Sequence, residues 1–274
     1  MKIDSLKMFV SDFDGTLADD NSIVSKNAVS ELHRLGEIGV VRILATGRSL
    51  FSLKTVVDDF FPIDYLVFSS GIGVFNWQTK QLLHENFIDS LSTELIYNFL
   101  VLNNYDFMVQ LPVPNNHFFH HISSGKPNSD FEARIKYYES HGVEKITECP
   151  HTASQFVIIC NDNIDHLKII SGEFSELKVV KATSPLDRKS IWIEVLPIGV
   201  SKASGIEFLR ELLNAKHHNI VSVGNDYYDL DMLNYASKNN AFVVENAPIE
   251  LKSEFNVIES NNDDGVAKLI KSLY

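Results

Sequence analysis

The pentapeptide DFDGT at residues 12–16 carries the residue types best suited to chemistry in this chain. Asp12 and Asp14 lie two residues apart, directly after a short apolar run, so their like charges would be close together. This arrangement is unfavourable unless a cation is shared. Gly15 lets the backbone approach a ligand closely, and Thr16 offers a hydroxyl and an N–H group to anionic oxygens. The alternative is an Asx turn at a strand end, for which one such Asp would suffice.

Three further polar clusters follow predicted strands or open the helix after one. Thr46 and Gly47 follow the β-branched run at residues 40–45, Lys202 opens a predicted helix, and the run GNDYYD at residues 224–229 follows another strand. Ligands of open α/β sheets bind outside the carboxyl ends of the strands. If the two ends of the chain form one sheet, all four clusters converge on one crevice.

The elements that must position these residues alternate between short apolar strands and amphipathic helices. The first third of the chain predicts strands at residues 8–10, 40–45 and 65–68, and the last third predicts strands at residues 220–223 and 241–244. Such alternation is typical of a parallel sheet wound on both faces. The predicted fold class is therefore α/β, with a Rossmannoid, doubly wound parallel-sheet core.

The middle of the chain does not alternate strictly, which favours a separate α+β unit inserted into the core. An insert need not destabilise its host, because closing a longer loop adds only slowly to the entropic cost. We predict a first core part at residues 1–84, an inserted cap domain at residues 85–189 and a second core part at residues 190–274. Residues 192–195 are expected to lead the chain back into the core sheet.

The net charge of -12 over 274 residues argues against a nucleic-acid partner or an anionic membrane surface. No stretch approaches the roughly 20 apolar residues that a membrane span needs. The first residues resemble no secretory signal, so a cytoplasmic monomer or homodimer is expected. A small anionic substrate is compatible with this charge, because a bound divalent cation reverses the local field of an acidic pocket.

In their order and spacing the four clusters resemble the haloacid-dehalogenase-like (HAD) hydrolase superfamily. Residues 12–16 match its first motif, D-x-D-G-T, while Thr46, Lys202 and residues 224–233 match its second, third and fourth motifs. The insert and the C-terminal segment resemble the Cof-type, sugar-phosphatase-like branch. The resemblance implies a phosphoric monoester hydrolase for a small phosphorylated metabolite, with sugar phosphates as the first expectation, and a cap that closes over the crevice.

The resemblance also implies a role for each motif residue. Asp12 would be the nucleophile that forms an aspartyl-phosphate, and Asp14 would protonate the leaving oxygen and then deprotonate the attacking water. Thr46, Gly47 and Lys202 would bind the phosphate oxygens. The implied cofactor is Mg²⁺, bound by the Asp12 carboxylate, the Asp14 carbonyl and a side chain of the fourth motif.

The fourth motif departs from the usual family pattern of G-D-x-x-N-D or G-D-x-x-x-D. Asn225 stands where the metal-binding Asp belongs, Tyr228 replaces the usual Asn, and Asp229 keeps its place. An Asn side chain is a legitimate oxygen ligand for Mg²⁺, but it removes one negative charge from the site. Asn225 is therefore favoured as the ligand, with Asp226 as an alternative and Asp229 as a third candidate.

Further candidates for contact with the substrate are Arg48, His117, His120 and Tyr228. For Arg48, a position behind the direct ligands or in solvent is favoured over direct contact, and the two histidines could lie on a solvated strand or loop. No Cys or carboxylate at ligand spacing accompanies these histidines, which argues against a second metal site.

Several rival interpretations stay open. Thr46 could cap the following helix, a role compatible with anion binding, and Lys202 could be a solvated lysine of a first helical turn. The whole protein could be a phosphomutase with the same nucleophile. It could also be a non-catalytic metabolite-binding descendant, an interpretation that Asn225 keeps open and that both aspartates of the first motif oppose.

Overall fold

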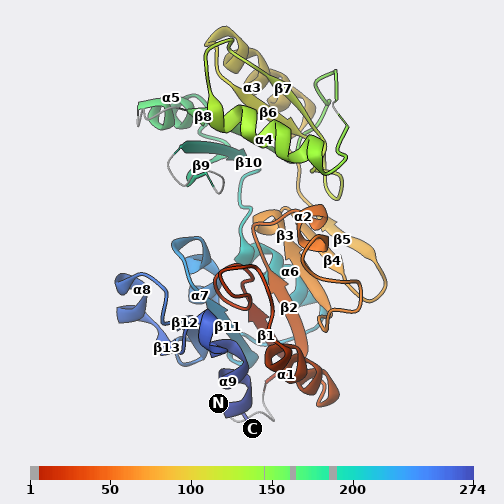
Figure 1. Ribbon diagram of the computed structural model, residues 1–274, viewed down its shortest axis with the longest axis vertical. Helices are drawn as coiled ribbons and strands as arrows, with labels where there is room; N and C mark the ends of the chain where they lie inside the picture. Colours follow the sequence, from red (N-terminus) through yellow and green to blue (C-terminus); the bar gives the residue numbers. More distant parts are fainter. Residues whose placement is uncertain (1–5, 145, 161–164, 185–189) are drawn as a thin grey trace. The chain divides into compact units, whose positions relative to one another are not determined.

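The computed structural model describes residues 6–144, 146–160, 165–184 and 190–274. The chain divides into two compact units, which Figure 1 traces in sequence colours. Met1–His84 and Ser201–Tyr274 form the core unit, and Glu85–Val200 forms the cap unit. Residue 189, the predicted end of the insert, lies outside the described residues.

One strand lies in a different sheet from the one that the sequence suggested. We expected residues 192–195 to enter the core sheet, but β10 (Ile191–Leu196) pairs antiparallel with β8 (Gln155–Cys160) and β9 (Lys178–Thr183) in the cap sheet. Its apolar residues pack in the interior of the cap unit. The period-two pattern correctly indicated a strand, but a local pattern cannot tell which sheet a strand joins.

Over the described residues, the core sheet has eight strands in the order β13-β12-β11-β1-β2-β3-β4-β5. Their bounds are β1 (Met8–Ser11), β2 (Val41–Ala45), β3 (Tyr65–Phe68), β4 (Gly73–Asn76), β5 (Gln81–Glu85), β11 (Ile220–Gly224), β12 (Ala241–Val244) and β13 (Asn256–Ile258). β1 pairs in parallel with both β2 and β11, whereas β3 and β4 pair antiparallel. The two ends of the chain thus meet at β1, where the strand order reverses, and the predicted α/β fold with a mostly parallel sheet is confirmed.

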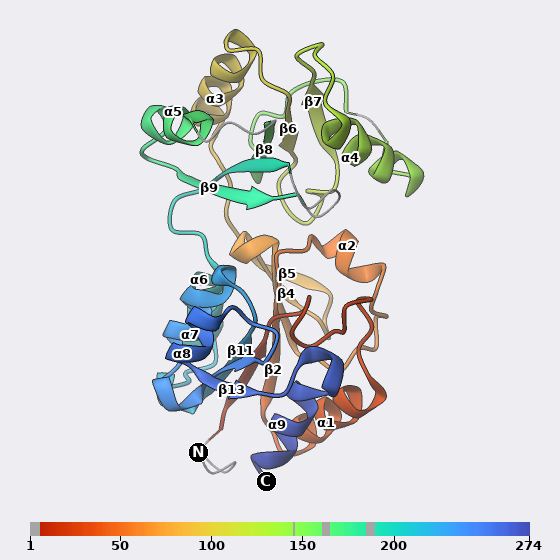
Figure 2. The same cartoon turned by 60° about the vertical axis from the view of Figure 1, so that its left-hand side comes forward.

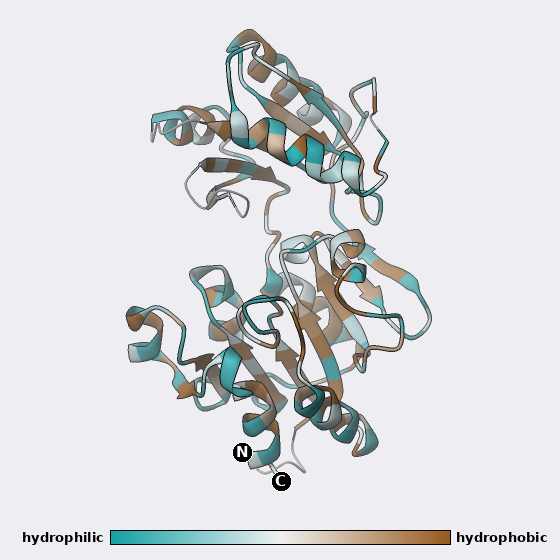
Figure 3. Ribbon diagram, in the orientation of Figure 1, coloured by the Kyte–Doolittle hydropathy of each residue, from teal (hydrophilic) through white to brown (hydrophobic). Residues whose placement is uncertain are grey.

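Helices cover the core sheet, whose central strands are strongly apolar (Figure 3). They are α1 (Lys26–Glu37), α2 (Leu50–Lys54), α6 (Lys202–Leu212), α7 (Leu230–Tyr235), α8 (Ile249–Glu254) and α9 (Gly265–Ser272). Apolar residues of α6 and α7 pack with β1, β2 and β3 in one cluster, and α1 and α9 lie side by side (Figure 2). Helix α2 begins at Leu50 because Ser49 caps it, so Thr46 is not its cap.

The cap unit is an antiparallel sheet in the order β7-β6-β8-β10-β9 with helices packed on it. Its other elements are β6 (Phe107–Gln110), β7 (Phe119–Ile122), α3 (Ser90–Leu102), α4 (Ser129–Ser140) and α5 (Asp165–Glu173). The predicted α+β insert is therefore confirmed. Among the described residues of both units, no helix has the length and hydropathy that a membrane crossing requires.

A strained turn sets the end of β3 against the start of α6. The turn η2 (Ser69–Gly71) has left-handed backbone angles, with φ of 55° at Ser70 and 97° at Gly71. A Cβ atom on Gly71 would lie only 1.9 Å from the carbonyl oxygen of Ser201. Only glycine permits this close approach, which fixes the backbone immediately before Lys202.

We predict that Gly71→Ala destabilises the core unit by about 2 kcal/mol more than Gly39→Ala. Both glycines have positive φ, but a Cβ on Gly39 would meet nothing within 4 Å, so this control carries only the backbone strain. Urea unfolding followed by the fluorescence of the buried Trp77, in a Trp192→Phe background, measures both variants. Equal losses would contradict the tight contact between Gly71 and Ser201.

Candidate active site

Lys202 joins two carboxylates inside the core unit. Its Nζ atom lies 2.6 Å from Oδ1 of Asp12 and 2.7 Å from Oδ1 of Asp229. The exposed fractions of Asp12, Lys202 and Asp229 are 5%, 5% and 1%. This burial rules out the alternative of a solvated first-turn lysine.

The charges of this cluster do not cancel. Burial and, to a lesser extent, the nearby Asp229 raise the pKa of Asp12, Lys202 opposes both effects, and the net result is a pKa of about 7. Burial alone would lower the pKa of Lys202, but the two carboxylates raise it above its ordinary value. One ammonium therefore faces two carboxylates, and the ionised cluster keeps one negative charge that a further cation could balance.

Local sequence brings the three groups together from distant parts of the chain. Asp12 directly follows β1, and Lys202 is the first residue of α6, which Ser201 caps through a reciprocal pair of hydrogen bonds with Ser204. Asp229 lies in the turn η4 (Tyr227–Asp229) after β11. Because β1 and β11 are neighbouring parallel strands, their carboxyl ends deliver both carboxylates to the same edge of the sheet.

Both oxygens of Asp229 are engaged within the protein. Oδ1 contacts Lys202, and Oδ2 accepts hydrogen bonds from the backbone N–H groups of Asn225 at 2.8 Å and Asp226 at 3.1 Å. A Cβ atom on Gly224 would lie 2.6 Å from Cβ of Asp229, so the glycine makes room for this arrangement. These contacts suit Asp229 to holding Lys202 and the fourth motif rather than to binding a metal.

Asn225 and Asp226 differ in where their side chains lie. A Cβ atom on Gly15 would lie 2.5 Å from the amide nitrogen of Asn225, so the Asn225 side chain packs against the loop of the first motif. Gly15 also has a φ of 71° and accepts a hydrogen bond at its carbonyl from Asn246. Asp226 is exposed, and its carboxylate accepts from the N–H group of Tyr227 at the start of η4. Of the two, Asn225 is the residue directed at the first motif.

The donor set around Asp12 fits the expected Mg²⁺. Among the residues that the structure describes, no three His, Cys, Asp or Glu side chains are grouped as a metal site. The expected ligand set needs only one of these, the Asp12 carboxylate, together with the Asp14 carbonyl and the Asn225 amide. Carboxylate, carbonyl and amide oxygens are ligands that hard cations prefer, and the uncancelled charge on the cluster favours a cation there.

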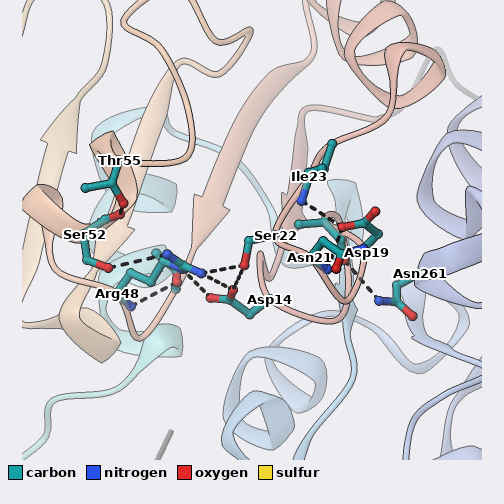
Figure 4. Close-up of polar contacts among 11 residues, drawn as sticks. Asp14, Asp19, Asn21, Ser22, Ile23, Arg48, Ser52, Thr55 and Asn261 are labelled. Atoms are coloured by element: carbon teal, nitrogen blue, oxygen red, sulfur yellow. Dashed lines mark hydrogen bonds and ion pairs between the residues drawn. The ribbon is translucent and has the colours of Figure 1, made fainter. Parts of the chain in front are cut away.

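The second motif contributes a buried threonine and an arginine, Arg48, which Figure 4 shows beside Asp14. Thr46 is 1% exposed, and its Oγ1 atom accepts a hydrogen bond from the N–H group of Arg48 at 3.1 Å, while Gly47 is exposed. The Arg48 guanidinium donates hydrogen bonds to both carboxylate oxygens of Asp14, with Nε–Oδ2 at 2.7 Å and Nη2–Oδ1 at 2.6 Å. The two aspartates of the first motif thus pair with different cations.

The remaining candidates lie in varied surroundings. His120 is buried in the cap unit, where its Nδ1 atom lies 3.2 Å from the carbonyl oxygen of Ile146, and its ring lies near Tyr97. His117 is partly buried, and burial lowers its pKa. Tyr228, in the core unit, is 48% exposed on η4. The surroundings of His120 suit a residue of the cap interior.

Sequence reasoning missed two features of this site. Ser22 contacts both Arg48 and Asp14, yet a serine in a polar turn gives no signal of its own. The partnership of Asp229 with Lys202 was also missed, although a buried lysine requires a buried acid, and the spare aspartate of the fourth motif could have been assigned to it.

We predict that, without metal, the stability of the wild type falls relative to Asp12→Asn as the pH rises from about 4 to about 7. The unfolded carboxyl releases its proton near its ordinary pKa of 3.8, whereas the folded one holds it up to about pH 7. Between these values the folded state binds more protons, so its stability declines with pH, on the order of 2–4 kcal/mol in total. Urea unfolding in the presence of a chelator measures the difference, with exposed Asp58→Asn as control. A difference independent of pH would contradict the raised pKa.

Comparison with known proteins extends over nearly the whole chain. The model of the haloacid dehalogenase-like hydrolase family matches residues 9–270. A relative, the 5-amino-6-(5-phospho-D-ribitylamino)uracil phosphatase of Bacillus subtilis, is 25% identical, with 98% of each chain covered.

Solved structures share the fold. A phosphatase of the HAD superfamily from Bacteroides thetaiotaomicron has a TM-score of 0.79 at 18% identity, covering 98% of this chain and 95% of its own. A HAD/COF-like hydrolase from Plasmodium vivax has a TM-score of 0.75 at 19% identity, with coverage of 98% and 95%. The resemblance seen in the motifs is confirmed by the family match, and the chain belongs to the haloacid dehalogenase-like hydrolases.

Proposed function

We propose that this protein is a metal-dependent phosphatase that hydrolyses phosphate monoesters of small metabolites through an aspartyl-phosphate on Asp12. The observation that carries the proposal is the buried cluster of Asp12, Lys202 and Asp229 at the carboxyl ends of β1 and β11. A carboxylate held by an ammonium is a fixed nucleophile, and the same ammonium can hold an incoming phosphoryl group. The phosphatase activity that the name of the Bacillus subtilis relative records supports this enzyme class.

Each residue of the site has a task in this proposal. The oxygen of the Asp12 carboxylate that is not bonded to Lys202 attacks phosphorus while Asp14, in its protonated form, donates a proton to the leaving oxygen. Thr46, Gly47 and Lys202 hold the phosphoryl oxygens. Asp14 then takes a proton from the water that attacks the aspartyl-phosphate, which releases phosphate and restores Asp12.

Enzymes of this family are generally metal-dependent, and we propose Mg²⁺ for this chain. The Asp12 carboxylate, the Asp14 carbonyl and the Asn225 side chain would hold it, with Asp229 as a positioning residue behind them. When bound, the cation would neutralise the nucleophile and the phosphate as they approach each other. Sugar phosphates are our first expectation for the substrate, and the cytoplasmic location and the oligomeric state stay predictions from the sequence.

The test of the function is a panel of phosphorylated metabolites assayed for free phosphate in the presence of Mg²⁺. We expect phosphate release, with sugar phosphates among the best substrates, and a rate for Asp12→Asn below about one thousandth of the wild type. Thermal unfolding of the variant checks that its fold is intact. An Asp12→Asn variant that keeps its activity would refute the assignment of Asp12 as the nucleophile. An isomerised sugar phosphate without free phosphate would identify the protein as a mutase instead.

A second prediction concerns the fourth motif. Asn225→Asp should tighten the apparent Mg²⁺ affinity by about tenfold, because it adds a negative charge at close range. Asn225→Ala should weaken the affinity, while Asp226→Ala should change it little, since Asp226 is exposed and caps its own turn. Titrations of activity and of metal-induced thermal stabilisation measure all three variants. The opposite ranking of the two alanine variants would assign the ligand to Asp226.

A further inference from the structure

Arg48 and Ser22 both contact the carboxylate of Asp14 (Figure 4). Besides its two bonds to Asp14, Arg48 donates from Nη2 to the Oγ atom of Ser22 at 2.8 Å. Ser22 Oγ lies 3.4 Å from Oδ1 of Asp14, on which both groups converge. The three side chains form a closed triangle, which we call the Asp14 clamp.

The clamp fixes the direction of the carboxylate as well as its location. A single hydrogen bond leaves a carboxylate free to turn about its χ angles, whereas a bidentate guanidinium fixes the plane of the group. Asp14 needs such support because its side chain is 48% exposed, whereas that of Asp12 is 7% exposed. An acid–base group must hold its oxygen within hydrogen-bond reach of the reacting atom, so orientation bears directly on its efficiency.

Both partners in the clamp are themselves anchored. Ser22 has a left-handed φ of 61° in a turn that Asp19 closes by accepting from the backbone N–H groups of Asn21 and Ile23 at 2.9 Å each. Asn261, near the other end of the chain, donates to the carbonyl oxygen of Ala18 at 3.2 Å and so ties this turn to the C-terminal segment.

Arg48 is held at both ends of its side chain. Its N–H group donates to Oγ1 of Thr46 at 3.1 Å, and Nη1 lies 3.5 Å from Oγ of Ser52. The guanidinium also lies 5.3 Å from the centre of the Phe13 ring. The clamp is therefore a built arrangement that includes residues from the first and second motifs and from the turn between them.

We propose that Arg48 and Ser22 are positioning residues that orient Asp14 for proton transfer to the leaving group. For this step Asp14 carries the proton on one carboxyl oxygen and keeps its bond to Arg48 through the other. This inference rests on the proposed function, because it presupposes that Asp14 is the acid. Arg48 then needs no contact with the substrate, and its task is distinct from that of Lys202.

The experiment compares phosphate esters whose leaving groups differ in basicity, p-nitrophenyl phosphate and an alkyl phosphate. Arg48→Lys keeps the positive charge but loses the bidentate hydrogen bonding to Asp14. It should lower kcat for the alkyl ester about tenfold or more and affect the aryl ester much less, because the alkoxide leaving group depends more on the acid. Asp14→Ala should show the same preference more strongly. Ser22→Ala should show it in weaker form, which provides a second, conservative test of the clamp.

The matched control is a second bidentate pair in the same unit. Arg42 contacts Asp64 with Nε–Oδ2 at 2.9 Å and Nη2–Oδ1 at 2.7 Å, at the opposite end of β2 from Thr46. Arg42→Lys should lower stability without changing the ratio of alkyl to aryl rates. A purely structural role of Arg48 would give the same result as this control.

The double variant Arg48→Lys/Asp14→Ala decides how Arg48 acts. If Arg48 works through Asp14, adding its substitution to Asp14→Ala should cause no further loss, because interacting residues are non-additive. Additive losses, or an Arg48→Lys variant that slows both esters equally, would overturn the clamp while leaving the proposed function intact. If Asp14→Ala itself slows both esters equally, Asp14 is not the acid, and this overturns the proposed function of Asp14 and the clamp together.

Discussion

A single buried ammonium, that of Lys202, pairs with two buried carboxylates, and the rest of the core unit is arranged around it. Asp12 comes from the first part of the chain and Asp229 from the last, so this one group joins the two halves that the cap unit separates in sequence. Removal of one partner from a buried ion pair commonly costs about 3–5 kcal/mol, since the remaining charge has no solvent to stabilise it. When Asp12 is ionised, the same cluster keeps one uncancelled negative charge, which gives the protein a physical reason to bind a cation beside Asp12. Stability and proposed chemistry therefore depend on the same three side chains.

Close backbone approaches at glycines make this arrangement possible. Gly71 lets the turn after β3 touch Ser201, Gly224 makes room for Asp229, and Gly15 makes room for Asn225. The second aspartate of the first motif has its own cationic partner, because Arg48 pairs with Asp14 while Lys202 pairs with Asp12. The carboxylates of Asp12 and Asp14 would repel each other, and pairing each with a different cationic side chain offsets this repulsion. In the site, each aspartate of the first motif has its own cationic partner, and the strand ends and the glycine contacts fix the positions of these groups.

The sequence predicted those features that local pattern encodes. The α/β core, the inserted α+β unit and the convergence of Asp12, Thr46 and Gly224 on neighbouring strand ends follow from alternating strands and helices and from motif order. The sequence could not predict that β10 joins the cap sheet, because the alternation of apolar and polar residues in a strand does not indicate which strands it pairs with. Nor could it predict the contact of Ser22 with Arg48, which depends on a left-handed turn held from the far end of the chain. The choice between Asn225 and Asp226 was left open for the same reason, since neighbouring side chains in a turn can point in different directions.

The central claim is that Asp12, held by Lys202, attacks phosphorus directly. The stereochemical course at phosphorus tests it most directly, using a good substrate whose phosphoryl group is made chiral with oxygen isotopes, with the reaction run in isotopically labelled water. Transfer first to Asp12 and then to water would invert the phosphorus centre twice, so the account predicts phosphate released with retention of configuration. Release with inversion would mean that water attacks the substrate in a single step, and it would contradict the assignment of Asp12 as nucleophile.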